Sequence, residues 1–223
     1  SDTRSPSPLR VQPKPVPKLG KSERTRAAIL NAALDFVWSH PFRDLTITSL
    51  MASTGVSRSA FYQYFTDLPE VMETLLTMLQ EEIFTAVEPW LGGVGDPVAL
   101  IQETLAGLVD VCHQRGPFLR AITDAASTDP RLEKAWLEFL VGFDDAATAR
   151  IEADQKQGLI PDFEARPVAF AINRLDAYTL LQAFGQHPRM QPGPVQEALA
   201  RIWISTLYGA QWMEKQSSDL VRT

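Results

Sequence analysis

The residues of this chain whose types suit chemistry are hydrogen-bond donors gathered in one segment, Thr46 to Phe65, which reads TITSLMASTGVSRSAFYQYF. Apolar side chains at helical spacing are interrupted there by Gly55, which predicts two short helices joined by a tight turn, Thr46 to Ser53 and Arg58 to Tyr64. Such a helix-turn-helix places its second helix in the DNA major groove. Spacing alone does not decide, because helical hairpins that never touch nucleic acid share it.

The side chains of this segment have the polarity that DNA contacts require. Arg58 and Gln63 can donate to base edges or to phosphates. Hydroxyl groups can donate to phosphate oxygens, and the segment carries them on Thr46, Thr48, Ser57, Ser59, Tyr62 and Tyr64. For the two tyrosines, half-buried packing on a helix surface is an equally good interpretation.

Charge is distributed unevenly along the chain, whose formal net charge is −6. Residues 1–65 hold nine Lys/Arg against four Asp/Glu, a net of +5, and the remainder holds 12 against 23, a net of −11. A basic front on an acidic body favours contact with a polyanion at the front. A basic tail without function would give the same asymmetry, so charge alone leaves both interpretations open.

The bulk properties favour an ordinary globular protein. The 223 residues suffice for one large or two small domains. A single cysteine, Cys112, excludes an internal disulfide framework and fits a reducing cytoplasm, where we expect the protein. The sequence contains no run of about 18 apolar residues, so we expect no contact with a membrane.

Catalytic and cofactor fingerprints are missing from the sequence: it has no GxSxG, HExxH, P-loop or dinucleotide motif. The three histidines lack metal-ligand spacing. We interpret the acidic pairs Glu81-Glu82 and Asp144-Asp145 as solvated helix faces. No catalytic residue, metal or cofactor is therefore expected, although an enzyme remains the main alternative from another class.

The chain is predicted to be all-helical, with about nine helices divided between a three-helix N-terminal domain and a larger body. Residues 1–20 are predicted to be a disordered, proline-rich basic arm, 21–66 the helix-turn-helix domain, 67–216 a ligand-binding and dimerisation domain, and 217–223 a flexible tail. Helices after residue 65 are expected at about 68–88, 97–115, 117–126, 130–156, 165–186 and 193–214. Four residues are predicted to cap the start of a helix: Ser22, Ser57, Asp67 and Asp129. Gly158 is predicted to stop the helix before it.

Three segments taken together resemble the N-terminal module of the TetR family: SERTRAAILNAALDFV, TITSLMASTGVSRSAFYQYF and DLPEVMETLL. The resemblance implies phosphate contacts from Thr46 and Tyr64 and backbone or minor-groove contacts from the basic lead-in Lys21, Arg24 and Arg26. It implies base or phosphate contacts across the second helix, from Arg58, Ser59, Ala60, Tyr62 and Gln63. Leu68 departs from the family, which usually has a phosphate-binding lysine there, so that contact is expected to be absent.

Two later segments, INRLDAYTLLQAFGQHP and RIWISTLYG, are similar to the last two helices of the ethionamide-resistance repressor branch of that family. The similarity implies a tunnel-like, largely apolar site for a small effector. It implies that Trp136, Phe143, Asn173, Asp176 and Trp203 line this site. We predict further lining residues among the apolar side chains of the body: Ile101, Leu105, Phe118, Phe139, Leu140 and Phe184. For Asn173 and Asp176, hydrogen bonds to a neighbouring helix are an equally good interpretation.

The predicted helix 165–186 is apolar on more than one face, so two surfaces must cover it. A core face and a two-fold dimer face would do so, with help from Leu199, Trp203 and Leu207 on the last helix. The sequence as a whole thus predicts a homodimeric TetR-type regulator, most simply a repressor, that binds a palindromic operator and is released by a small apolar ligand. Activation by the same fold, and a helical protein without DNA affinity, remain open alternatives.

Overall fold

The computed structural model describes residues 20–209, which form eight α-helices, one 3₁₀ helix and no strand. The all-helical prediction is confirmed. The predicted arm, the tail 217–223 and the predicted last turns of the final helix, to residue 214, lie outside the described residues, apart from Gly20. The helices are α1 (Lys21–Val37), η1 (Phe42–Asp44), α2 (Ile47–Ala52), α3 (Arg58–Phe61), α4 (Leu68–Leu91), α5 (Pro97–Ala126), α6 (Pro130–Lys156), α7 (Ala165–Phe184) and α8 (Pro192–Leu207).

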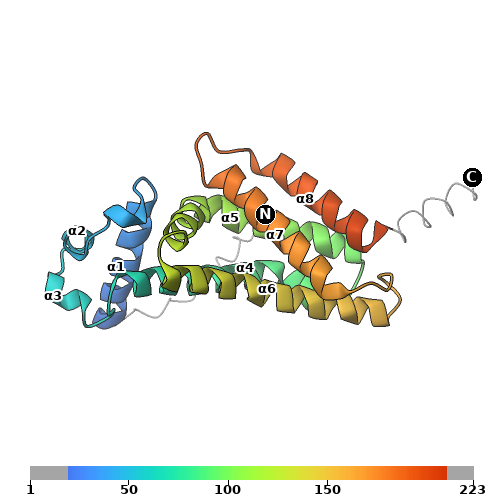
Figure 1. Ribbon diagram of the computed structural model, residues 1–223, viewed down its shortest axis with the longest axis horizontal. Helices are drawn as coiled ribbons and strands as arrows, with labels where there is room; N and C mark the ends of the chain where they lie inside the picture. Colours follow the sequence, from blue (N-terminus) through green and yellow to red (C-terminus); the bar gives the residue numbers. More distant parts are fainter. Residues whose placement is uncertain (1–19, 210–223) are drawn as a thin grey trace, which may run out of the picture.

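The headpiece, which we define as α1 to α3, forms a lobe at one end of the elongated molecule (Figure 1). Phe61 and Phe65 are buried against apolar residues of α1 and α2, so α3 is anchored through its aromatic side chains. Gly55 adopts a left-handed φ of 70° in the turn between α2 and α3, a conformation that glycine adopts without steric cost.

Of the two caps predicted in the headpiece, Ser22 is wrong, whereas Ser57 is confirmed as the N-cap residue of α3. Ser22 lies inside α1, whose N-cap is Gly20, and the Glu23 carboxylate accepts from the Gly20 N–H in place of a serine cap. Ser57 occupies the N-cap position of α3, but its side chain makes no capping hydrogen bond and instead pairs with the Ser59 hydroxyl at 3.1 Å.

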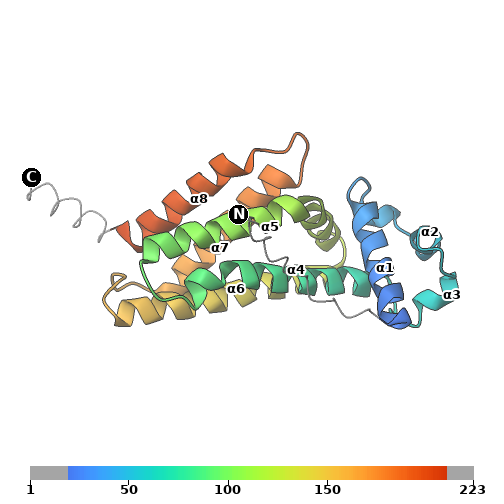
Figure 2. The same cartoon turned by 180° about the vertical axis from the view of Figure 1, so that it is seen from behind.

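Helix α4 connects the headpiece to the body. The Asp67 carboxylate accepts from the Glu70 N–H at 3.0 Å, as the sequence predicts, and fixes the start of the helix. From there α4 runs out of the headpiece and along the body (Figures 1 and 2). Its apolar stripe is buried over the whole length, at Val71, Met72, Leu75, Leu76, Leu79, Ile83, Val87 and Trp90.

Helix α5 is one continuous helix of 30 residues where the sequence predicts two, separated at Gly116-Pro117. Proline removes one helical hydrogen bond and usually kinks or ends a helix. Here Gly116, Pro117, Phe118 and Leu119 are all buried, so tertiary packing outweighs that local cost. The helix count falls by one as a result.

The body is arranged around α5, which packs against α4, α6, α7 and α8. In Figures 1 and 2, α4 and α6 run side by side along one side of the body, while α7 and α8 lie on the other. No described helix is long and apolar enough to cross a bilayer.

The predicted dimer face of α8 is wrong: Leu199, Trp203 and Leu207 are buried inside the protomer. They point inward because α8 packs against α5 and α7. Exposed apolar side chains lie instead on α7, where Phe170 is 51% and Tyr178 is 67% exposed.

Substituting two glycines that lie inside helices distinguishes the effect of packing on stability from the effect of helix propensity. A Cβ on Gly116 would lie 2.2 Å from the Phe184 carbonyl oxygen, which is fixed backbone. A Cβ on Gly142 would meet only the mobile end of Gln80, at 2.8 Å. We predict that Gly116→Ala lowers the free energy of unfolding by about 1–3 kcal/mol, whereas Gly142→Ala leaves it unchanged or raises it by up to about 1 kcal/mol. Urea unfolding measures both; equal effects of the two substitutions would contradict this packing.

Candidate functional site: a helix-turn-helix surface and an apolar cavity

The headpiece exposes most of the side chains that the sequence predicts to contact DNA. Ten of the twelve are exposed: Lys21, Arg24, Arg26, Thr46, Thr48, Ser57, Arg58, Ser59, Tyr62 and Gln63. Ala60 and Tyr64 are partly buried and pack against the core. Tyr62 is 55% exposed, which settles one of the two tyrosines as a surface residue.

The predicted second helix is longer than the one observed. Regular helix covers only Arg58–Phe61, so Tyr62, Gln63 and Tyr64 lie in the turn that follows it. Thr46 is engaged as the N-cap of α2, where its Oγ1 accepts from the Ser49 N–H at 3.0 Å. A phosphate contact from Thr46 would therefore add to a capping role.

A cavity of about 90 Å³ lies in the body, lined by side chains of α4, α5, α6, α7 and α8. This is several times the space that one water molecule needs. Eight of the eleven predicted lining residues border it: Leu105, Trp136, Phe139, Leu140, Phe143, Asn173, Asp176 and Trp203. The other three, Ile101, Phe118 and Phe184, are buried in the core and do not line the cavity.

Few polar groups face this cavity, and most are engaged. Asp176 accepts from the Trp203 indole N–H, with 3.0 Å from Nε1 to each carboxylate oxygen. Asn173 donates to Asp144 Oδ1 at 2.9 Å. Both side chains therefore make the interhelical hydrogen bonds that the sequence offered as one interpretation, and both also line the cavity.

The prediction for Asp144 is wrong. This carboxylate is 2% exposed, whereas Asp145 beside it is exposed and pairs with Arg166. Arg174 binds Asp144 through two hydrogen bonds of 3.0 Å. The buried charge is thus paired, as a buried carboxylate requires, and the pair ties α6 to α7 beside the cavity.

Burial raises the pKa of Asp176 to about 7, although the hydrogen bond from Trp203 acts in the opposite direction. The Cys112 thiol also lines the cavity, and burial, together with the negative charge of Asp176, raises its pKa to about 12. Among the described residues, no Lys, Arg or His forms an ion pair with Asp176.

Comparison with known proteins agrees with this geometry. Residues 101–209 match the family described as "Transcriptional regulator EthR, C-terminal domain". The chain is 25% identical to the HTH-type transcriptional regulator EthR of Mycolicibacterium smegmatis over 186 residues, which cover 82% of this chain and 86% of that protein.

The chain belongs to the TetR family of transcriptional regulators. Its fold is similar to that of a TetR-family regulator from Syntrophomonas wolfei, with a TM-score of 0.73 and 17% identity over 83% of this chain and 95% of that one. GusR of Salmonella enterica gives a TM-score of 0.70 and 18% identity over 85% of this chain and 98% of that one. The protein is a regulator, so the enzyme alternative is set aside.

A buried polar network that the sequence did not predict lies beside the cavity of this TetR-family chain. The Trp90 indole N–H donates to the Tyr208 hydroxyl at 2.7 Å, which donates to Asp154 at 2.6 Å. Asp154 also pairs with Arg150 at 3.1 Å. No local pattern signals this network, because its residues come from α4, α6 and the end of α8, and only the fold brings them together.

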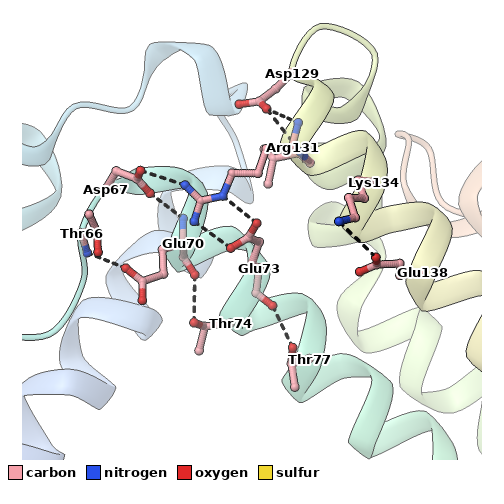
Figure 3. Close-up of polar contacts among 11 residues, drawn as sticks. Thr66, Asp67, Glu70, Glu73, Thr74, Thr77, Asp129, Arg131, Lys134 and Glu138 are labelled. Atoms are coloured by element: carbon pink, nitrogen blue, oxygen red, sulfur yellow. Dashed lines mark hydrogen bonds and ion pairs between the residues drawn. The ribbon is translucent and has the colours of Figure 1, made fainter.

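Three residues that the sequence did not single out for this role, Asp67, Glu73 and Arg131, meet at the junction of headpiece and body (Figure 3), and we call them the clamp. The Arg131 guanidinium donates to Asp67 at 2.8 Å and to both Glu73 oxygens at 2.7 and 2.9 Å. Arg131 lies in the first turn of α6, and both carboxylates lie at the start of α4. The clamp therefore fixes α4, directly after the helix-turn-helix, to the body.

The raised pKa of Asp176 predicts a pH dependence of stability. Between its ordinary pKa, 3.8, and about 7, the unfolded chain loses the proton that the folded chain keeps, so stability is highest at low pH and falls as pH rises. Between about pH 5 and pH 8 the free energy of unfolding of the wild type, relative to Asp176→Asn, should fall by about 3 kcal/mol. Urea unfolding at the two pH values tests this, and a constant difference between the two proteins would contradict it.

Proposed function

We propose that this regulator binds a palindromic operator as a homodimer, represses by occupying it, and leaves DNA when a small, largely apolar ligand fills the cavity. The observation that carries the proposal is the physical continuity of α4, which follows α3 directly and whose other end lines the cavity through Ile83, Val87 and Trp90. A change in cavity shape can therefore reach the headpiece through one helix.

The DNA end of the proposal rests on the exposed donors of the headpiece. Arg58 and Gln63 are exposed on α3 and in the turn after it, where they can reach base edges. Lys21, Arg24 and Arg26 are exposed along the start of α1 and supply positive charge for the DNA backbone. In a dimer, two such headpieces about 34–36 Å apart would match successive major grooves.

The dimer interface is proposed to lie on the last two helices, chiefly on the outer face of α7. Phe170 and Tyr178 are exposed there at helical spacing, and Leu175 is 37% exposed beside them. Large apolar side chains grouped on one helix face are typical of subunit contacts. Residues of α8 that point inward cannot contribute, so α8 would take part through its outer face.

The ligand end of the proposal rests on the apolar, aromatic lining of the cavity. Trp90, Trp136 and Trp203 border it, with Phe139 and Phe143. A ligand shifts operator binding only as far as it prefers one conformation over the other. Because the clamp fixes the start of α4 to the body, a ligand that favours one conformation of the body would change DNA binding by moving the start of α4.

The contribution of the reading residues is tested by single substitutions. We predict that Arg58→Ala or Gln63→Ala weakens binding to the specific operator by about 1–3 kcal/mol, or changes which base is preferred, because a base contact is lost. Gel shifts with systematically varied duplexes measure both effects, with Lys134→Ala on the body as the control. Unchanged affinity and preference in both variants would refute the assignment of α3 and the turn after it as the reading element.

The clamp is tested by removing its arginine. We predict that Arg131→Ala speeds amide hydrogen exchange over the first turns of α4 and weakens operator binding severalfold, because the headpiece loses its fixed orientation on the body. Lys134→Ala is the matched control, since Lys134 makes only a 3.8 Å contact with Glu138, within the same helix (Figure 3). If the two variants behave alike in exchange and in operator affinity, the clamp has no positioning role.

A further inference from the structure

The cavity contains an acidic group whose charge no protein cation balances. Asp176 is 5% exposed and lines a cavity whose other walls are almost all aliphatic or aromatic. A buried carboxylate offers about four acceptor positions, and among the described residues only the Trp203 indole N–H donates to it. Transfer of an unpaired carboxylate into an apolar site is costly, so the site as it stands disfavours the charged form.

The charged and titratable groups around Asp176 do not supply the missing cation. From α5 the Cys112 thiol faces Asp176, and a thiol never carries a positive charge. The buried acids of α6 are Asp144 and Asp154, and each holds its own cation: Asp144 binds Arg174 of α7 through two hydrogen bonds, and Asp154 pairs with Arg150. From α8 the contact is the neutral Trp203 ring.

The side chain of Asn173, which also lines the cavity, likewise favours a ligand that carries a hydrogen-bond donor. Asn173 lies three residues before Asp176 and so on the same face of α7; its amide nitrogen already donates to Asp144. The side-chain oxygen of Asn173 is a second acceptor among the residues that line the cavity. Aromatic rings surround this pair, and cations are attracted to such rings.

We propose that the effector is a protonated amine on a small apolar group, with its ammonium bound to Asp176 and its apolar part among the aromatic side chains of the cavity. The ligand then supplies the counter-ion that the protein lacks. This inference rests on the proposed ligand site and narrows it from any apolar molecule to cationic amines. Neutral apolar molecules of the same shape would bind more weakly, and carboxylates would be excluded by charge repulsion.

The test uses three probes of closely similar shape: benzylamine, benzyl alcohol and benzoate. Binding to the full chain without DNA is followed by calorimetry and by tryptophan fluorescence, because Trp90, Trp136 and Trp203 line the cavity. At about pH 8 benzylamine should bind roughly tenfold more tightly than benzyl alcohol, since charge-assisted hydrogen bonds are about twice as strong as neutral ones. Benzoate should bind most weakly.

Two variants assign any preference to Asp176. Asp176→Asn keeps an acceptor for the Trp203 N–H but removes the charge, and it should abolish the preference for the amine. Asp145→Asn, which alters an exposed carboxylate on α6 paired with Arg166, should keep it. In the wild type the preference should also decline below about pH 7 as Asp176 is protonated, and Asp176→Asn should show no such decline.

Equal or tighter binding of benzyl alcohol by the wild type, a preference that survives in Asp176→Asn, or no binding of any probe would each overturn the inference. Gel shifts with the operator separate this outcome from failure of the proposed function. If the protein binds its operator but shows no preference for the amine, only the inference fails. If it prefers the amine but binds no duplex, the proposed function fails and the ligand class stands.

Discussion

The structure depends on one constraint, which is that α4 is buried in the apolar core at both of its ends. At its start Val71 and Met72 are completely buried close to the headpiece, and at its end Val87 and Trp90 are buried around the cavity. Closely packed interiors transmit displacement, because a side chain cannot shift without its neighbours shifting. The clamp adds a polar fixation at the point where α4 leaves the headpiece. We therefore infer that packing along α4 couples the orientation of the headpiece to the shape of the cavity.

The buried carboxylates of the body differ in whether a cation pairs with them. Asp144 is balanced by Arg174, and Asp154 by Arg150 and the Tyr208 hydroxyl. Asp176 has only an indole N–H and a pKa raised to about 7. Among the described residues the other buried carboxylates are paired with cations, whereas Asp176 faces the cavity without one, which is the physical basis for the cationic effector that we propose.

The sequence predicted those features of the fold that depend only on residues close together in the chain. The caps at Asp67 and Asp129 and the left-handed Gly158 after α6 appear as expected, because each depends on its own backbone neighbours. The continuous α5 was not predicted, because burial on both sides of Pro117 overrides a local signal. Nor was the burial of Asp144, since one residue of an acidic pair faces inward only once α7 is packed beside it.

The cavity lining shows the same division between local and tertiary information. Resemblance and helical spacing identified most of the lining residues. Ile101, Phe118 and Phe184 are also apolar and lie at helical spacing, yet they are buried in the core and do not border the cavity. Which apolar side chains border empty space is decided by how five helices fit together. The cavity residues of α4 were not predicted for that reason, although they lie on the helix that joins the cavity to the headpiece.

If α4 couples the cavity to the headpiece, filling the cavity must change the distance between the two headpieces of the proposed dimer. A spin label on Arg43→Cys, exposed in η1, reports that distance without reacting at the buried Cys112. Ala147→Phe serves as a stand-in for a ligand, because Ala147 lines the cavity and is buried. The account predicts a changed headpiece distance together with weakened operator binding in the filled, folded variant. An unchanged distance and unchanged operator affinity would contradict it.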